Sequence, residues 1–144
     1  MDEVSIRVET IEDGFGGHLI LVDIGGHREA LMADDAVTVG ADLVEASRKV
    51  ERAKSQGDKI FGAMRDGEEW ELDEDGFGVR VIELPGKGYN VALHLRRMLI
   101  SSASDTMEAV GKEIREQGQH LLDCRDTLRW LYELQKEYEN KAEE

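Results

Sequence analysis

The sequence predicts an α+β fold in which an antiparallel sheet is assembled from two tandem βββα-like units, the second ending in a long helix. Three observations support this prediction. Short apolar or alternating segments are separated by glycine-containing turns, as in strands joined by hairpins. The pentapeptide EDGFG occurs at residues 12–16 and again at 74–78. Finally, residues 105–144 contain no proline and repeat apolar residues at helical spacing.

The first unit, residues 1–58, is expected to contain three strands and a helix. Strands are expected over residues 4–8, 18–24 and 27–33, and a helix over residues 42–56. The run HLILVDI is apolar almost throughout, which is typical of a central strand covered on both faces. Gly25 and Gly26 permit a tight reversal, and the acidic residues 34–35 suggest a connector before the helix.

The second unit, residues 59–144, repeats this plan. Strands are expected over residues 60–64, 69–73, 79–84 and 89–99, and an extended helical region follows from residue 105. Residues 12–33 align without gaps on residues 74–95 with nine of twenty-two positions identical. Duplication explains this identity, and it places Phe15 and Phe77 in equivalent buried positions. Convergence on a common D-G turn is the alternative. The two units are expected to fold as one compact domain.

Composition and charge narrow the classes of protein. The chain has 32 acidic residues against 18 Lys and Arg, a net charge of −14 that is spread along its whole length. The electrostatic field of this negative charge disfavours direct binding to nucleic acid and favours basic partners. A solvated surface or a salt-adapted host would also explain the charge. No apolar run is long enough to cross a bilayer, so no membrane association is expected. A single cysteine, Cys124, and an N-terminus without a secretion signal predict a cytoplasmic protein.

An acidic stretch, residues 66–75, has seven acids in ten positions. In a strand, Glu69, Glu71 and Asp73 would project from one face and form an acidic ladder, which Asp75 extends. Such a ladder is predicted to dock on a basic protein surface, for example that of a nucleic-acid-binding protein, where it could act as an inhibitor. Protection of an edge strand by charge is the alternative. The stretch also approaches the spacing of a calcium loop, but the twelfth position is Ile82 instead of a bidentate glutamate.

The C-terminal region follows a seven-residue register of the coiled-coil type. One seam position holds Met107, Ile114, Leu121, Leu128 and Gln135, and the other holds Val110, Gln117, Cys124, Leu131 and Tyr138. Leu121, Leu128 and Leu131 are therefore predicted to form a homo-oligomer interface, with packing inside one monomer as the alternative. Cys124 is expected to be a small buried hydrophobe in this seam. Because of Gly118, one helix and two helices both remain open.

No motif indicates catalysis, so enzymatic activity, cofactors and a metal are not expected. Strand alternation would allow His18, Asp23 and His27 to converge across a hairpin as metal ligands, but this arrangement lacks a fourth ligand. His94, Arg96 and Arg97 form a local basic group that suggests an anchor for a small anion. Pairing of these arginines with nearby carboxylates is the alternative.

The leading functional hypothesis is a non-enzymatic, homo-oligomeric acidic binding protein that docks on a basic site of another macromolecule. The alternative is a protein that binds or sequesters a small anionic ligand in a pocket between repeats or subunits.

Overall fold

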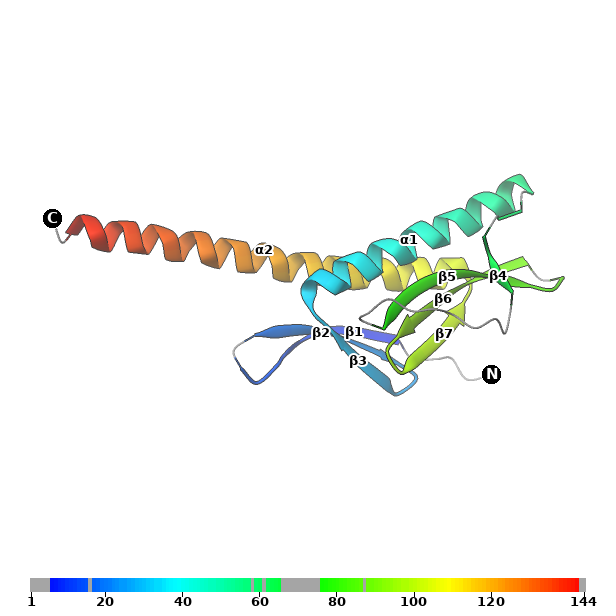
Figure 1. Cartoon of the computed structure of the whole chain (residues 1–144), viewed down its shortest axis with the longest axis horizontal. Coiled ribbons are helices and arrows are strands. Elements are labelled where there is room, and N and C mark those ends of the chain that lie inside the picture. The colour runs from blue at the N-terminus through cyan, green and yellow to red at the C-terminus, as the bar shows by residue number, and fades with distance from the viewer. Residues whose placement is uncertain are drawn as a thin grey trace.

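The computed structural model describes residues 6–15, 17–57, 59–60, 62–65, 76–86 and 88–142. In this part of the chain the elements are β1 (Ile6–Glu12), β2 (His18–Ile24), β3 (His27–Leu31), α1 (Ala33–Gln56), β4 (Met64–Arg65), β5 (Phe77–Leu84), β6 (Gly88–Leu95), β7 (Met98–Ser102) and α2 (Ser104–Ala142). The fold is mixed α+β with a long last helix, as predicted (Figure 1).

The strands form two sheets instead of the single antiparallel sheet expected. The first sheet is antiparallel in the order β1-β2-β3, and the second has the order β4-β5-β6-β7. In the second sheet, β4 runs parallel to β5, and the other neighbours are antiparallel. As predicted, β2 is a central strand, but it is not buried on both faces as expected. Ile20, Val22 and Ile24 are buried, whereas the alternate residues Leu19, Leu21 and Asp23 are only partly buried.

The two helices lie side by side above the sheets and run antiparallel (Figure 1). At one end Arg48 forms an ion pair of 3.2 Å with Glu108, and at the other Gly118 lies against Ala33. Helix α1 has most of its sheet contacts with β5 and β6, whereas α2 contacts mainly β1 and β2. Because each helix covers the sheet of the other half, the two halves share one core.

Helix α2 is continuous through both of its glycines. A Cβ on Gly118 would lie 2.9 Å from the carbonyl oxygen of Ala33, and a Cβ on Gly111 would lie 2.7 Å from the Cβ of Leu43. Glycine costs a helix roughly 1 kcal/mol relative to alanine. Here it allows α1 to approach closely, so the position of the glycines marks a contact and not a break.

Several boundaries differ from the prediction; for example, the strand expected over residues 4–8 is β1 (Ile6–Glu12) in the described chain. Helix α1 begins at Ala33, nine residues before the expected start at residue 42. Asp34 and Asp35, which suggested a connector, lie in its first turn, where carboxylates interact favourably with the helix dipole. The single strand expected over 89–99 is divided into β6 and β7 by a turn at Arg96 and Arg97. Where a strand was expected over residues 60–64, the described chain has the two-residue strand β4, which begins at Met64.

The expected equivalence of Phe15 and Phe77 is wrong. Phe15 is 95% exposed at the turn between β1 and β2, whereas Phe77 is 5% exposed and opens β5. In the first turn Asp13 Oδ1 accepts hydrogen bonds from the backbone N–H groups of Phe15 (2.7 Å) and Gly17 (3.0 Å). In the second EDGFG, Phe77 and Gly78 instead begin β5 and pair with β6. The two phenylalanines therefore lie in different backbone structures, a turn and a strand.

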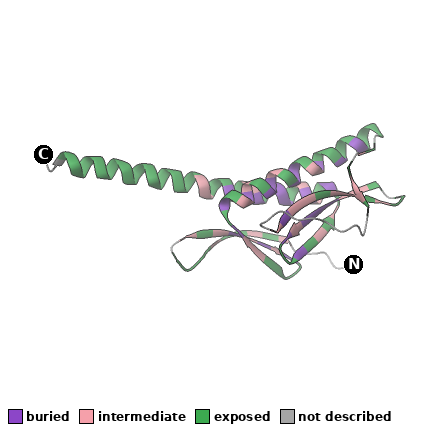
Figure 2. Cartoon of the chain, in the orientation of Figure 1, coloured by how far each residue is buried: buried purple, intermediate pink, exposed green. Residues whose placement is uncertain are grey.

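Beyond its contact with α1, helix α2 projects from the body of the protein (Figure 2). Every residue from Asp123 to Lys141 is exposed. In the described part of the chain, neither helix has the length and apolar character needed to span a membrane.

Candidate functional site

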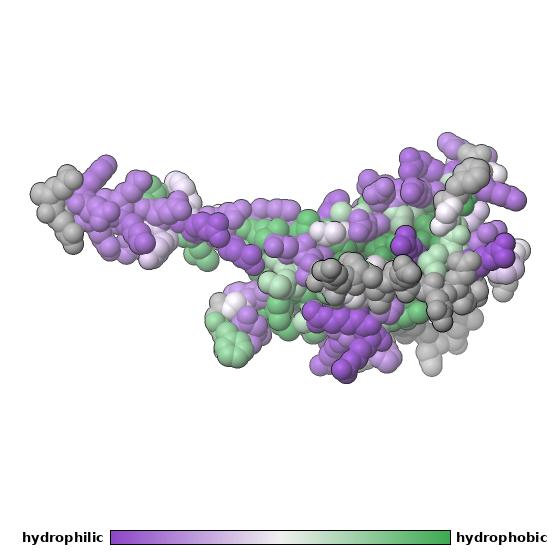
Figure 3. All heavy atoms as spheres, in the orientation of Figure 1, coloured by the Kyte–Doolittle hydropathy of each residue, from purple (hydrophilic) through white to green (hydrophobic). Residues whose placement is uncertain are grey.

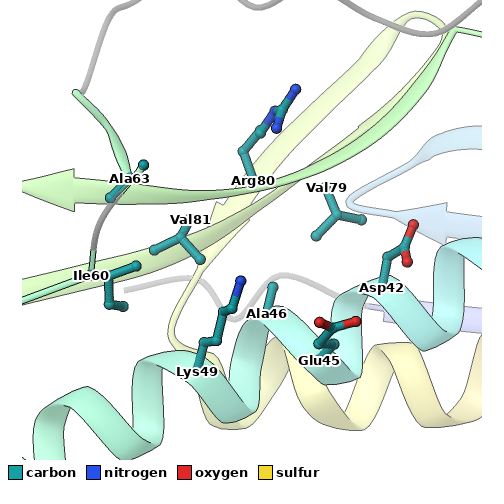
Figure 4. A pocket seen from close by; sticks show the side chains of 10 residues that line it. Asp42, Glu45, Ala46, Lys49, Ile60, Ala63, Val79, Arg80 and Val81 are labelled. Atoms are coloured by element: carbon teal, nitrogen blue, oxygen red, sulfur yellow. The ribbon is translucent and has the colours of Figure 1, made fainter.

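One candidate site is a hollow of about 220 Å³ between α1 and β5 (Figure 4). The side chains of Asp42, Glu45 and Lys49 reach it from α1, because residues three and four apart share one face of a helix. Val79 and Val81 of β5 face the helix, while Arg80 points away from it, as strand alternation requires.

The charged lining residues of this hollow balance, with Asp42 and Glu45 against Lys49 and Arg80. Partial burial raises the pKa of the Asp42 carboxyl above its ordinary value, and the neighbouring Glu45 carboxylate raises it further. All four charged residues remain open to solvent. Among the described residues, no group of three or more His, Cys, Asp or Glu is arranged to hold a metal ion. Its described lining contains no histidine, cysteine or hydroxyl side chain, so the reactive groups that it offers are the Lys49 amine and the two carboxylates.

The predicted acidic ladder, Glu69, Glu71, Asp73 and Asp75, lies outside the described residues.

The basic group His94, Arg96 and Arg97 lies at the end of β6 and in the turn that follows. The Nδ1 atom of His94 is 3.3 Å from the carbonyl oxygen of Gly76. Arg96 has a positive φ of 50°, and its guanidinium lies 3.7 Å from the Glu29 carboxylate and 5.3 Å from the centre of the Phe77 ring. Arg96 thus ties β3 to the second sheet, in line with the carboxylate-pairing alternative.

The proposed convergence of His18, Asp23 and His27 is wrong. His18 opens β2 opposite Glu12, and His27 opens β3 opposite Ile24, at the other end of β2. Seven residues of strand separate these ends, a distance of about 20 Å. Asp23 instead forms an ion pair of 3.1 Å with Arg28 and accepts a hydrogen bond from the Gly26 N–H.

A second candidate site is a groove of about 520 Å³ between the β1–β2 hairpin and α2. It is lined by Thr10, Gly17, His18, His120, Leu121, Cys124, Arg125 and Leu128. Cys124 is exposed, which corrects the expectation of a buried hydrophobe, and its Sγ lies 3.6 Å from His120 Nε2. The sequence offered no signal for this groove, since it depends on how the hairpin lies beside the helix.

The predicted oligomer residues differ in their surroundings. Leu121 packs against the core, whereas Leu128 and Leu131 are exposed on the projecting part of α2. The same part of the helix exposes further large apolar side chains: Trp130, Tyr132, Leu134 and Tyr138. Figure 3 shows apolar patches between the polar side chains of this segment and at the tip of the β1–β2 hairpin.

Comparison with protein-family models, with curated proteins and with solved structures finds no match.

Proposed function

We propose that the chain is a non-enzymatic, homo-oligomeric binding protein that associates through the projecting half of α2 and presents its acidic body to a basic partner. The observation that carries this proposal is the apolar face of a helix that leaves the body. Large side chains such as Leu128 (67% exposed) and Tyr138 (77% exposed) face water there. Extended exposed apolar surfaces of this kind are typical of protein interfaces.

The distribution of charge supports separate roles for the projecting helix in self-association and for the body in partner binding. Residues 123–142 contain five acids and four bases, a net charge of −1, while the whole chain has −14. Two copies would repel one another through their bodies but hardly through this segment. The remaining negative charge is left to steer the assembly toward a basic surface.

We also propose that residues 1–58 and 59–144 are related units, in a register that differs from the EDGFG alignment. A shift of 71 residues aligns Gly40 with Gly111, the two glycines that meet between the helices. The same shift aligns the buried set Ile20, Val22 and Ile24 with the buried set Val91, Leu93 and Leu95. Equivalent helices would then cross at equivalent glycines.

Two measurements test the function. Light scattering of the purified chain should give a mass larger than 16.2 kDa; a monomer at all concentrations would contradict the proposal. Affinity capture from the native cell at two salt concentrations should yield a basic partner whose binding weakens with salt.

The role of the acidic stretch in partner binding is tested by replacing Glu69, Glu71 and Asp73 with Gln, Gln and Asn. The captured partner should then associate more slowly and with a flatter salt response. Neutralising Glu139, Glu143 and Glu144 is the control and should leave association unchanged. Equal effects of the two sets would mean that the stretch only solvates the surface.

A further inference from the structure

The groove between the β1–β2 hairpin and α2 has apolar residues on its helix side and an exposed aromatic residue near its hairpin side. On one side are Leu121 and Leu128 of the helix, and on the other is the hairpin, whose tip carries Phe15 two residues from Gly17 in the groove wall. The Asp13 hydrogen bonds define the turn that leaves Phe15 almost fully in water. The hairpin that forms one wall of the groove therefore carries an exposed aromatic side chain in its turn.

The apolar face of α2 is continuous from the core into this region. Leu121 still packs against the core, and Leu128, Leu131 and Tyr138 continue the row on the same side of the helix. From Leu121 to Ala142 the helix extends about 31 Å, from a rise of about 1.5 Å per residue. The chain thus carries both a groove beside a helix and an unpartnered helix.

We propose that the groove receives the projecting half of α2 from a second copy of this chain, antiparallel and reciprocally. This inference rests on the proposed self-association and names its geometry. The two seam positions meet best when Leu128 faces Leu131 of the second copy and Leu121 faces its Tyr138. Phe15 then covers the outer side of the incoming helix.

Two properties favour a second copy over another protein. The projecting segment is almost neutral in a chain of charge −14, so it is the part that a second acidic chain approaches with little repulsion. Five of the exposed apolar side chains, Leu128, Leu131, Tyr132, Leu134 and Tyr138, lie in the seam or beside it. They offer roughly 600 Å² per chain, or about 1,200 Å² for a pair, the lower limit for a stable interface. Phe15 and the groove add to this area on both sides of the twofold axis.

The register is tested by disulfide cross-linking of the full chain with copper phenanthroline. In the proposed register Cys124 faces residue 135 of the second copy, so Gln135→Cys should yield a covalent dimer. Within one helix these positions lie about 16 Å apart, too far for an internal disulfide. The unmodified chain should not cross-link, because the two copies of Cys124 are separated by a similar distance along the pair. Arg129→Cys, on the polar face, is the control and should stay uncross-linked.

Each other outcome overturns the proposal in a distinct way. Cross-linking of the unmodified chain would indicate parallel helices, and equal cross-linking of Arg129→Cys would indicate random collision. If light scattering shows a dimer but Gln135→Cys does not cross-link, the self-association stands and binding of the helix in the groove is refuted. A monomer would refute both the self-association and this binding, and the groove would then be a candidate site for a helix of another protein.

Phe15→Ser provides a second readout that leaves the helix unchanged. It should raise the dimer dissociation constant roughly tenfold, because a buried aromatic anchor is lost. An unchanged constant would remove the hairpin from the interface.

Discussion

Gly40 and Gly111 face each other where α1 crosses α2. A Cβ on Gly40 would lie 2.6 Å from the carbonyl oxygen of Gly111, and a Cβ on Gly111 would lie 2.8 Å from that of Gly40. Both distances are well below van der Waals contact, and the blocking atoms belong to the backbone. The separation of the helices is therefore set by the absence of two side chains.

Gly111→Ala is expected to destabilise the fold in spite of alanine's higher helix propensity. The propensity gain is up to about 1 kcal/mol, whereas forcing two packed helices apart costs about 1–3 kcal/mol, and the Gly40 backbone cannot rotate away as a flexible side chain would. We expect a net loss that thermal denaturation will detect as a fall in Tm of several degrees. Asn140→Ala, on the exposed part of α2, is the control and should leave Tm unchanged or slightly raised. A more stable Gly111→Ala chain would contradict the close approach.

Arg96 combines a positive φ with two side-chain contacts, to Glu29 and Phe77, and two substitutions separate these effects. Arg96→Ala removes the Glu29 and Phe77 contacts but keeps a side chain at a φ of 50°, so it should destabilise by about 1–2 kcal/mol. Arg96→Gly loses the same contacts but relieves the strain, and should be about 1 kcal/mol more stable than Arg96→Ala. Urea denaturation measures both. Arg97→Ala, next to it in the same turn, should change little, and equal values for the Ala and Gly variants would mean that the turn is unstrained.

Asp42 is predicted to make stability fall as pH rises through the acidic range. Its pKa is raised in the folded chain, by burial first and by Glu45 second, so the folded state binds more protons there than the unfolded state. Stability therefore decreases from the ordinary aspartate pKa up to the raised one and stays lower above it. Asp42→Asn should be slightly more stable than the unmodified chain at pH 7, by less than about 1 kcal/mol because solvent screens this exposed group. The gain should vanish at low pH, where Asp42 is protonated in both states.

Glu139→Gln is the matched control for this measurement, since it also removes one negative charge but lies on the projecting helix. Denaturation midpoints at several pH values compare the two variants. If both variants gain the same stability at pH 7, the effect comes from the net charge of the chain and not from the hollow beside β5.

Features with a local sequence signal could be predicted from the sequence, whereas features set by tertiary packing could not. The central strand β2 was predictable because a run of apolar residues between glycines needs no knowledge of its partners. The early start of α1 was not predicted because aspartates such as Asp34 and Asp35 are common both in connectors and in the first turn of a helix. Gly111 and Gly118 suggested a break because only the position of α1 reveals why they are glycines.

The EDGFG alignment failed to identify equivalent positions for the same reason. EDGFG is a turn sequence, and turns of identical composition occur between strands and before them. The helix-to-helix glycine pair and the buried alternation of the central strands depend on tertiary packing, so they became visible only in the structure. Of the candidate surfaces, the heptad seam indicated the projecting helix, but the hairpin that borders it could not be inferred from the seam.

Leu128→Glu combined with Leu131→Glu is expected to dissociate the oligomer without unfolding the body. Both side chains are exposed in the single chain, so the free energy of unfolding of the monomer should change by less than about 0.5 kcal/mol. In the assembly the same positions become a seam, where two carboxylates per copy would be buried without partners at a cost of several kcal/mol. Light scattering and circular dichroism together measure the result: a mass of one chain with unchanged helical content. Arg129→Glu is the control, because it makes the same change of −2 in net charge on the polar face and should leave the mass unchanged. If it dissociates the oligomer equally well, repulsion between chains, and not the apolar seam, controls assembly.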